Sequence, residues 1–480
     1  MRPRVLDYFY IGGERVAPAT GRTITVVSPW TEQPVAVVPE ACEPDVDRAV
    51  AAAVAAQESA DWGRAPLPVR VAAMRRFADV YEARKDEVAD AMSTEMGCPR
   101  GQAVAMHIDP AVKAARYYAE LIKTFPLSER RVGSRTTLVR RRPVGVAAAV
   151  VPWNGPALLS MLKVAPALAA GCAVVLKPSP EAPLSAYVLA GIAAEAGLPP
   201  GALNIVTADR AVSEYLVTHP DVRKVSFTGS TAAGRRVAEL CGRSLKRVSL
   251  ELGGKSAGIF LEDADVPAAV RALRLASFAN AGQVCTARTR LIVPRSRYDE
   301  VVAALAVMAD SIAVGDPGDP ATEMGPLVSR RQRQRVNDYI AAGRAEGARQ
   351  VTTRKADDMP PTGWFVPPTV FADVSNSMKI AREEIFGPVV CVLRYDAVDE
   401  AIAIANDSEY GLSGSVFTAD VDAGLVVADR VQSGTFGVNS FGNDMTAPFG
   451  GVKASGLGRE MGPEGLEEYL EFQSVLVPAS

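Results

Sequence analysis

Apolar residues follow different periods in successive parts of this chain. In residues 1–40, short apolar runs are separated by turn signals at Gly12-Gly13 and Thr20-Gly21, a pattern that predicts a small hairpin. From residue 44 onward, Val46, Val50 and Val54 fall on one face of a helix. We therefore expect strands in residues 1–40 and mainly helices in residues 44–123.

Strands and helices alternate from residue 136 onward. Residues 136–140 are typical of an exposed strand, and the apolar run 146–151 is typical of a buried one. The next expected elements are a helix at 157–169, a strand at 172–176, a helix at 184–196, a strand at 203–206, a short helix near residue 211 and a strand at 225–227. Repeated βα units of this kind predict an α/β fold with a parallel sheet covered by helices on both faces.

A second α/β section begins after residue 250. Its expected strands are 256–261, 290–293, 389–393 and 415–418, and its expected helices are 267–281, 298–312 and 397–405. Residues 353–368 are rich in Pro and Asp and predict a surface loop. Residues 466–478 predict a short helix and a strand, which with residues 136–140 could form a small sheet that reaches a neighbouring subunit.

Length and charge exclude several classes of protein. The chain has 480 residues, of which 48% are hydrophobic and 22% charged, as in globular proteins with more than one core. A net charge of -3 provides no basic field for nucleic acid or an anionic membrane, so neither is expected as a partner. The candidate apolar run 164–176 is too short for a membrane span, and the N-terminus lacks an apolar signal core. We therefore expect a cytoplasmic protein.

Motifs with polar and glycine residues follow three of the expected strands. Asn154 comes after the strand 146–151, Lys177 follows the strand 172–176, and Gly229 and Ser230 come after the strand 225–227. Because open parallel sheets bind ligands at the carboxyl ends of their strands, these residues should gather at one edge. The spacing from Gly229 to Gly234 opens a helix and suits a pyrophosphate, although an ordinary helix cap explains it equally well.

The cysteines and histidines narrow the chemistry. Six cysteines show no metal-ligand spacing, so no metal site is predicted. Cys285 stands where an apolar helical run meets a turn with Gly282, but free cysteines are usually small buried hydrophobes, so its position alone does not indicate catalysis. A Cys–His dyad would have to use His107 or His219, the two histidines of the chain. His107 falls in a helical region and is expected to be packed.

Seven motifs occur in one order along nearly the whole chain: Pro152-Trp153-Asn154, Lys177-Pro178-Ser179, Phe227-Thr228-Gly229-Ser230, Glu251-Leu252-Gly253-Gly254-Lys255, Gly282-Gln283-Val284-Cys285, Glu383-Glu384-Ile385-Phe386-Gly387-Pro388 and Pro448-Phe449-Gly450-Gly451-Val452-Lys453. In this order the set resembles the aldehyde dehydrogenase superfamily. The ordered set is far more specific than any single motif.

The resemblance implies a three-part architecture. A Rossmann-like dinucleotide-binding domain would comprise residues 1–123 and 141–250, and an α/β catalytic domain residues 251–455. A small β oligomerisation element would comprise residues 124–140 and 456–480. Members of the family assemble as dimers or tetramers, so a homodimer or homotetramer is expected.

The resemblance also assigns catalytic roles, each with a chemical reason. The Cys285 thiolate would add to the carbon of an aldehyde substrate, because thiolates are strong nucleophiles. The Asn154 amide and the Cys285 backbone N–H would hold the oxyanion. After hydride transfer to NAD, Glu251 would activate the water that hydrolyses the thioester. A buried salt bridge is the alternative role of Glu251.

Further residues are implied in cofactor binding. By the resemblance, Trp153 and Ser230 meet the pyrophosphate, Lys177 the adenosine ribose and Glu384 the nicotinamide ribose. The remaining expected cofactor residues are Ser179, Gly229, Gly234, Leu252, Gln332 and Phe386. Lys163 and Glu460 could form either a proton path to Glu251 or a structural ion pair. The run Arg330-Arg331-Gln332-Arg333 is expected to be a solvated face or an interface rim.

Two departures from the family pattern concern specificity. Some NAD-preferring relatives carry Glu three residues after the motif lysine, where this chain has Pro180, so NAD is favoured while NADP stays open. Gly155 replaces a frequent aromatic residue, which should widen the substrate tunnel. Other expected lining residues are Leu158, Leu159, Leu162, Phe441, Met445 and Phe449. We therefore expect an aliphatic or aromatic aldehyde as substrate.

Three other functions are alternatives to this one: a semialdehyde dehydrogenase, a non-catalytic homologue and a cysteine hydrolase without a nicotinamide cofactor. The intact set of Cys285, Glu251 and Asn154 disfavours the non-catalytic homologue. The presence of Glu251 also favours hydrolysis to the free acid over transfer of the acyl group to coenzyme A.

Overall fold

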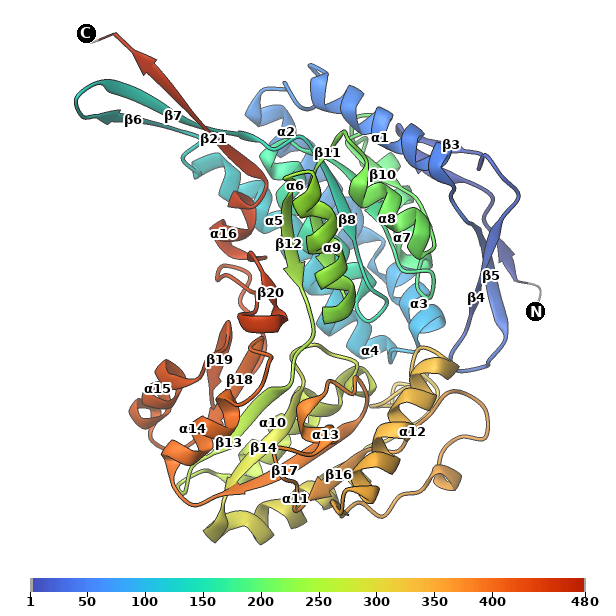
Figure 1. Cartoon of the computed structure of the whole chain (residues 1–480). Helices are drawn as coiled ribbons and strands as arrows, with labels where there is room; N and C mark the ends of the chain where they lie inside the picture. The colour runs from blue at the N-terminus through green and yellow to red at the C-terminus, as the bar shows by residue number, and fades with distance from the viewer. Residues whose placement is uncertain (1–2, 479–480) are drawn as a thin grey trace.

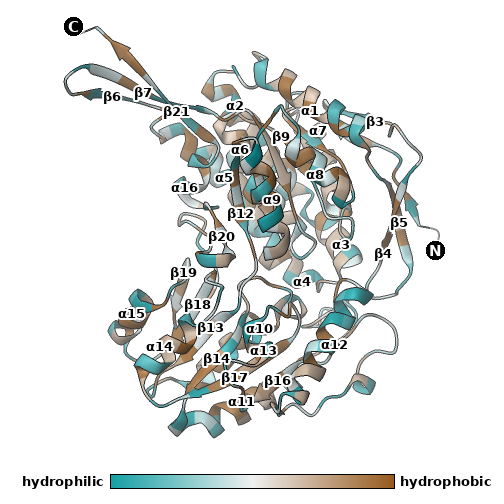
Figure 2. Cartoon of the chain, viewed as in Figure 1, coloured by the Kyte–Doolittle hydropathy of each residue, from teal (hydrophilic) through white to brown (hydrophobic). Residues whose placement is uncertain are grey.

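The computed structural model describes residues 3–478 and contains two large mixed sheets and two small ones in that range. Figure 1 shows the two large sheets, each flanked by helices, one above the other, with a β arm projecting from the upper unit. In Figure 2 the strands inside both units are mostly apolar, while the outer faces of helices α9 (Thr231–Arg243) and α12 (Arg330–Ala345) are hydrophilic. The observed α/β architecture confirms the predicted fold class.

The first large sheet has the strand order β20-β12-β11-β8-β9-β10-β2-β3. Its strands are β2 (Phe9–Ile11), β3 (Glu14–Val16), β8 (Val146–Val150), β9 (Ala173–Lys177), β10 (Leu203–Ile205), β11 (Val222–Thr228), β12 (Arg247–Glu251) and β20 (Gly456–Leu457). The five strands β12, β11, β8, β9 and β10 run parallel, whereas β20 and β2 pair antiparallel at either side.

Helices cover this sheet and bury its apolar strands. They are α1 (Glu43–Glu58), α2 (Leu67–Ala83), α3 (Lys85–Met96), α4 (Arg100–Gln102), a π-helical turn (Ala103–Ile108), α5 (Asp109–Thr124), α6 (Pro156–Ala170), α7 (Leu184–Glu195), α8 (Arg210–Thr218) and α9. The predicted helical region 44–123 and the predicted βα alternation are confirmed. The predicted N-terminal hairpin is the antiparallel pair β2 and β3.

The second large sheet has the order β15-β16-β17-β14-β13-β18-β19 and is parallel except for β15. Its strands are β13 (Ser256–Phe260), β14 (Arg288–Pro294), β15 (Arg349–Gln350), β16 (Thr369–Ala372), β17 (Val389–Tyr395), β18 (Ser413–Phe417) and β19 (Thr435–Val438). Its helices are α10 (Val266–Phe278), α11 (Tyr298–Asp310), α12, α13 (Lys379–Arg382), α14 (Val398–Asn406) and α15 (Val421–Arg430), followed by α16 (Gly462–Glu467) beyond the sheet.

Two predictions in this unit are partly wrong. The helix expected at 267–281 ends at Phe278, because the next residues turn into the left-handed region. The surface loop expected at 353–368 holds only in part, since Trp364 and Phe365 are buried and Phe365 packs edge-on against Trp30 with ring centroids 5.7 Å apart.

Two small sheets complete the described chain. One has the order β1-β5-β4, formed by β1 (Arg4–Val5), β4 (Thr23–Val27) and β5 (Pro34–Pro39). The other is the arm, formed by β6 (Ser128–Val132), β7 (Thr136–Pro143) and β21 (Leu470–Val477). The antiparallel register joins Leu470 to Pro143 and Val477 to Thr136, which confirms the predicted sheet between these distant segments.

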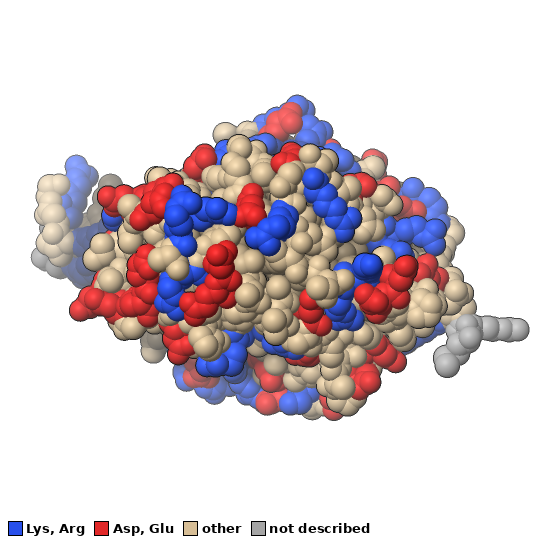
Figure 3. Space-filling model, turned by 90° about the horizontal axis from the view of Figure 1, so that it is seen from below, with Lys and Arg blue, Asp and Glu red and all other residues tan. Residues whose placement is uncertain are grey.

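The surface facing downward in Figure 1 mixes charges of both signs, as Figure 3 shows. Within residues 3–478, no helix is both long enough and apolar enough to cross a bilayer. The same residues contain no cluster of His, Cys, Asp and Glu side chains that could hold a metal ion.

Candidate active site

The strand order of the first sheet creates a crevice between β8 and β11. These strands are neighbours, but the chain continues from β8 toward β9 on one side and from β11 toward β12 on the other. Such a reversal is where open α/β sheets bind ligands, outside the carboxyl ends of the strands. Trp153 and Asn154 follow β8, and Gly229 and Ser230 follow β11. The topology therefore brings these motifs to one edge, as the sequence predicts.

A cleft of about 540 Å³ opens at this edge, and residues of both large units line it. The lining includes nine of the predicted site residues: Cys285, Asn154, Trp153, Gly229, Ser230, Leu252, Gln332, Glu384 and Phe386. Four others, Glu251, Lys177, Ser179 and Gly234, lie outside this lining. Two aromatic residues of the lining, Trp153 and Phe386, contact each other edge-on with ring centroids 5.3 Å apart.

The glycine-rich turn after β11 caps helix α9 and allows that helix to pack closely against Leu252. Ser230 caps α9, because its Oγ accepts a hydrogen bond of 3.3 Å from the Ala233 backbone N–H. Gly234 allows close packing, since a Cβ there would lie 2.3 Å from the Leu252 side chain. The helix cap considered from the sequence is therefore present, and the N-terminus of α9 still faces the cleft through Ser230.

The loop before Cys285 has an unusual backbone. Asn280, Ala281 and Gly282 have φ values of 51°, 55° and 71°, which for the first two is a costly left-handed conformation. Hydrogen bonds hold it in place: Asn280 Nδ2 donates to the Asn154 carbonyl at 2.9 Å, and Gln283 Nε2 donates to the Asn280 carbonyl at 3.0 Å. This strained turn ends α10 and sets the position of Cys285.

Further close contacts hold the same loop in place. A Cβ at Gly282 would lie 2.2 Å from the Gly387 carbonyl oxygen, so only glycine fits. Gln283 is fully buried, and its Oε1 accepts a hydrogen bond of 3.0 Å from the Val328 N–H. No role was assigned to Gln283 from the sequence. Its polar side chain in the otherwise small and apolar motif Gly282-Gln283-Val284-Cys285 could have indicated a buried hydrogen bond.

Asn154 faces the cysteine loop directly. Its Nδ2 donates a hydrogen bond of 3.0 Å to the Gln283 carbonyl, two residues before Cys285. The side chain is buried but contributes to the cleft wall. The amide is therefore positioned by the same network that positions the cysteine.

Cys285 is half-buried against an apolar cluster that includes Leu162, Phe449 and Met445. Burial raises the pKa of its thiol to about 12, and the carboxyl groups of Glu384 and Glu251 contribute to the shift. The neutral thiol is therefore the resting form in the absence of a ligand, and ionisation needs a proton acceptor or an added positive charge.

Glu251, the last residue of β12, is a buried carboxyl without a partner. Neither carboxyl oxygen has a hydrogen-bond partner among the described residues, and Oε1 lies against Gly450. Burial first, and then the charge of Glu460, raise the pKa of Glu251 well above its usual value. The structure shows no salt bridge to Glu251 within residues 3–478, so the alternative role does not apply.

Lys163 and Glu460 form a buried ion pair beside Glu251. Lys163 Nζ also donates a hydrogen bond of 2.7 Å to Thr228 Oγ1, and Thr228 lines the cleft. Glu460 Oε2 has no partner among the described residues. The structural ion pair is present, and the proton path through it stays a prediction.

Glu384 enters the cleft over the two glycines that follow Leu252. Its Oε1 accepts a hydrogen bond of 3.0 Å from the Gly254 N–H, and a Cβ at Gly253 would lie 2.4 Å from its Oε2. Burial raises the pKa of Glu384 to about 7, against the opposing effect of that hydrogen bond. Gly253 therefore leaves room for the carboxylate, whereas a Cβ at Gly254 would lie 2.5 Å from the Cys285 carbonyl oxygen.

Gln332 supports the segment that carries Glu384 and Phe386. Its Nε2 donates a hydrogen bond of 2.8 Å to the Phe386 carbonyl, and Arg335 donates one of 2.7 Å to the Glu384 carbonyl. Both side chains also line the cleft. They fix the backbone of this wall from α12.

Lys177 ends β9 and is buried. Burial lowers the pKa of its ammonium group to about 8, and its Nζ donates a hydrogen bond of 3.0 Å to the Pro178 carbonyl. Ser179 Oγ donates to the Glu181 carboxylate. These residues form a polar strand end beside the cleft.

The aldehyde dehydrogenase family model matches residues 16–475. This chain belongs to that family. It is an aldehyde dehydrogenase by descent and architecture, and the resemblance drawn from seven ordered motifs is confirmed. Similarities in sequence and in structure to known proteins agree with this family.

Among curated relatives, the chain is 49% identical to a geranial dehydrogenase of Castellaniella defragrans, with 98% of each chain covered. It is 42% identical to a 3-succinoylsemialdehyde-pyridine dehydrogenase of a Pseudomonas species, again with 98% of each chain covered.

Two solved structures show the same fold. A Mycobacterium tuberculosis aldehyde dehydrogenase complexed with NAD+ has a TM-score of 0.96 and 44% identity, with 99% of each chain covered. A mutant aldehyde dehydrogenase C of Pseudomonas syringae, solved with NAD+ and octanal, has a TM-score of 0.95 and 43% identity, covering 100% of this chain and 99% of that one.

One specific expectation for this aldehyde dehydrogenase is wrong. The space beside Gly155 does not widen the substrate tunnel, because a Cβ there would lie 3.0 Å from His107 Nδ1. His107 is buried in the π-helical turn with neither ring nitrogen bonded among the described residues, and burial lowers its pKa to about 4. A neutral imidazole therefore occupies the place of the missing aromatic side chain. The prediction that His107 is packed is confirmed.

Proposed function

We propose that this chain oxidises an aldehyde to the carboxylic acid with NAD, through a thioester on Cys285 that water hydrolyses with the help of Glu251. The observation that carries the proposal is the arrangement of three groups. A half-buried thiol and the Asn154 amide line one cleft. The buried Glu251 carboxyl, which has no hydrogen-bond partner within residues 3–478, ends the strand β12 of the same sheet edge.

The cleft suits a dinucleotide for reasons visible in its walls. The N-terminus of α9 offers backbone N–H groups and a positive dipole end for a pyrophosphate. Glu384 offers carboxylate oxygens to a ribose, and the Trp153–Phe386 pair offers apolar surface to a ring. The NAD+ complexes of two similar structures support this assignment. When bound, the nicotinamide supplies the hydride acceptor.

The first chemical step forms a bond between Cys285 Sγ and the aldehyde carbon. The thiol gives up its proton to solvent water in the cleft, and the carbonyl oxygen becomes an oxyanion held by Asn154 Nδ2 and the Cys285 backbone N–H. Loss of hydride from the same carbon leaves a thioester on Cys285. The strained turn at residues 280–282 serves this step by holding nucleophile and amide in one network.

The second step breaks the carbon–sulfur bond. Glu251 takes a proton from water while the water oxygen attacks the thioester carbon, and Cys285 leaves as a thiolate. A raised pKa suits a general base that works near neutral pH, because it makes the carboxylate a better proton acceptor. Since neither carboxyl oxygen has a hydrogen-bond partner in the described part of the chain, no such bond has to break when the carboxyl turns toward the acyl group.

The substrate is proposed to be an uncharged aliphatic or aromatic aldehyde. The wall beside Cys285 is apolar, with Leu158, Leu159 and Met445 among its members. An anionic group placed against this cluster would lose its hydration without gaining a charged partner from it. The geranial-oxidising relative and the octanal complex agree with this choice.

An aldehyde panel tests the substrate class. We expect kcat/KM for octanal and benzaldehyde to exceed that for succinate semialdehyde by at least about tenfold, since the carboxylate of the semialdehyde would lose its hydration against an apolar wall. Initial rates of reduced-cofactor formation provide the measurement. A preference for succinate semialdehyde would favour the semialdehyde alternative, which the 42% identical relative represents.

We further propose the three-part division expected from the sequence, with the arm of β6, β7 and β21 as the subunit contact. The arm projects from the body, and Phe472 and Leu476 on β21 are 61% and 62% exposed. Apolar side chains on a projecting sheet are typical of an interface. Light scattering should give a dimer or tetramer, and a monomer mass at micromolar concentration would contradict the proposal.

A further inference from the structure

The loop after β9 lacks the carboxylate expected three residues beyond Lys177. Pro180 occupies that position and offers neither a side-chain acceptor nor a backbone N–H. Glu181 follows it and is the one carboxylate of the described loop from Lys177 to Ala182. The carboxylate that is absent at Pro180 is therefore present one residue later, at Glu181.

Glu181 is held at the border of the cleft by two contacts. Its Oε2 accepts a hydrogen bond from Ser179 Oγ, and its Oε1 accepts one of 3.2 Å from Arg331 Nη2. Arg331 lines the cleft together with Ser230. The Glu181 side chain is 29% exposed, so its carboxylate stays accessible to a ligand. These contacts link the end of β9 to α12 across the cleft border.

The charges at this place complement one another. The buried ammonium group of Lys177 has its pKa lowered mainly by burial, and Glu181 provides the largest opposing effect. A donor and an acceptor thus stand side by side at the end of the second strand of a βαβ unit. In dinucleotide-binding sheets this is where a carboxylate accepts hydrogen bonds from a ribose, whereas a free Arg accommodates a 2′-phosphate.

We propose that Glu181 sets the cofactor preference of this chain: its carboxylate binds the hydroxyl groups of the adenosine ribose and repels a 2′-phosphate. The proposal rests on the proposed NAD-dependent function. Arg331 has a matching role, because its pairing with Glu181 keeps its guanidinium from serving as a phosphate ligand. The loop thus favours NAD in spite of Pro180.

Direct binding measurements test the proposal without relying on turnover. Calorimetric Kd values for NAD+ and NADP+ are compared in the full-length protein and in Glu181→Gln, both carrying Cys285→Ala. Removing the negative charge should strengthen NADP+ binding and weaken NAD+ binding, so that the ratio of the two Kd values moves toward NADP+ by at least about tenfold. Arg331→Ala, which frees the carboxylate, should move the ratio the opposite way.

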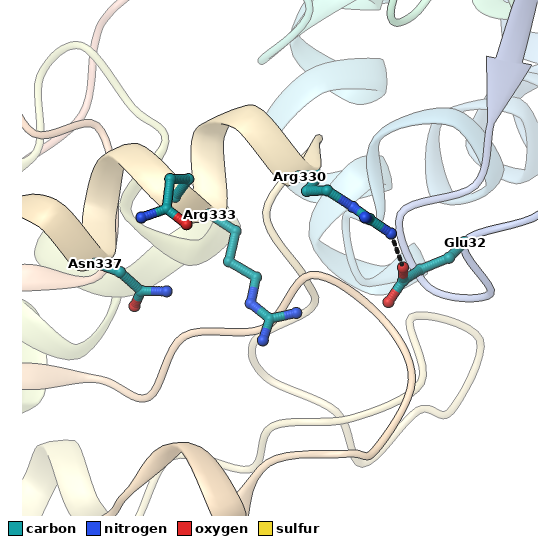
Figure 4. A pocket seen from close by; sticks show the side chains of 5 residues that line it. Glu32, Arg330, Arg333 and Asn337 are labelled. Carbon is teal, nitrogen blue, oxygen red and sulfur yellow. Dashed lines mark hydrogen bonds and ion pairs between the residues drawn. The ribbon is translucent and has the colours of Figure 1, made fainter.

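Glu32→Gln is a closely matched control. Glu32 accepts from Arg330, the preceding residue of the same arginine run, at the same distance of 3.2 Å, and its side chain is 25% exposed. Figure 4 shows this pair in a neighbouring pocket with Arg333 and Asn337, and Glu32 is not part of the cofactor cleft lining. The control removes one carboxylate beside α12 without touching the strand end.

The possible outcomes distinguish the proposed role of Glu181 from the proposed NAD-dependent function on which it rests. If Glu181→Gln leaves the Kd ratio within about twofold of the parent, or if Glu32→Gln shifts it equally, Glu181 does not set the preference. If Glu181→Gln does not fold, Arg331→Ala still tests the proposal. A ratio of the two Kd values that does not change in Arg331→Ala would overturn the proposed role of Glu181. A parent protein that binds neither dinucleotide instead overturns the proposed NAD-dependent function itself.

Discussion

Cys285→Ala is expected to abolish aldehyde oxidation and to leave NAD+ binding intact. Without Sγ no covalent bond to the substrate forms, so turnover should fall by at least about 10⁴-fold. The thiol packs against an apolar cluster, and its loss leaves a cavity that costs only about 1 kcal/mol of unfolding free energy. Absorbance of the reduced cofactor measures the activity, and calorimetry measures the binding.

Cys241→Ala controls for the removal of a thiol as such. Cys241 is buried on α9, with the pKa of its thiol raised to about 11 by burial, and it does not line the cleft. We expect this variant to keep its turnover with a similar loss of stability. Substantial oxidation by Cys285→Ala would show that another residue is the nucleophile.

Glu251→Gln is expected to separate hydride transfer from hydrolysis. The first step does not need this carboxylate, whereas the second does, so the thioester should accumulate. Stopped-flow absorbance should show a burst of reduced cofactor close to the enzyme concentration, followed by a steady state slower by about 10²-fold or more. Wild-type enzyme and Glu251→Gln are compared with the same aldehyde.

The pH dependence provides a second signature of this carboxyl. Because burial and Glu460 raise the pKa of Glu251, its base form accumulates as the pH rises through that value, and wild-type hydrolysis should accelerate with it. The Gln variant should lose this rise. A carboxyl whose pKa is higher in the folded state stabilises the fold at low pH and loses that contribution as the pH increases. Above the raised pKa, therefore, Glu251→Gln should melt at the same temperature as the wild type or higher.

Glu468→Gln is the matched control, since it removes a neighbouring half-buried carboxyl that has partners. Glu468 accepts from Lys224 Nζ at 2.7 Å and from Ser249 Oγ at 2.8 Å. Its loss should lower the melting temperature without producing a burst, because the buried Lys224 would lose its ion-pair partner. Steady turnover without a burst in Glu251→Gln would falsify the role of Glu251 as base in a slow hydrolysis.

The helical and strand periods of the apolar residues were sufficient to predict much of the fold. The apolar run at 146–151 and the alternation up to residue 227 predicted β8, β9, β10 and β11 and hence the sheet edge where the motifs meet. Two elements of the site were not predicted from the sequence. One is β12, a short strand with charged ends, and the other is α12, in which many arginines interrupt the apolar pattern. The arginine run was predicted to be a solvated face or an interface rim, and Arg331 is 84% exposed but also lines the cleft.

The sequence by itself determined the family, the order of the strands in the chain and the chemical types that the site needs, because those follow from motif identity and from periods within single elements. Only the tertiary structure decided which distant residues meet. His107 fills the space beside Gly155, and Arg331 pairs with Glu181 from 150 positions away. A period tells which face of an element is buried, but the partner of that face depends on how separate units pack, and no local pattern records it.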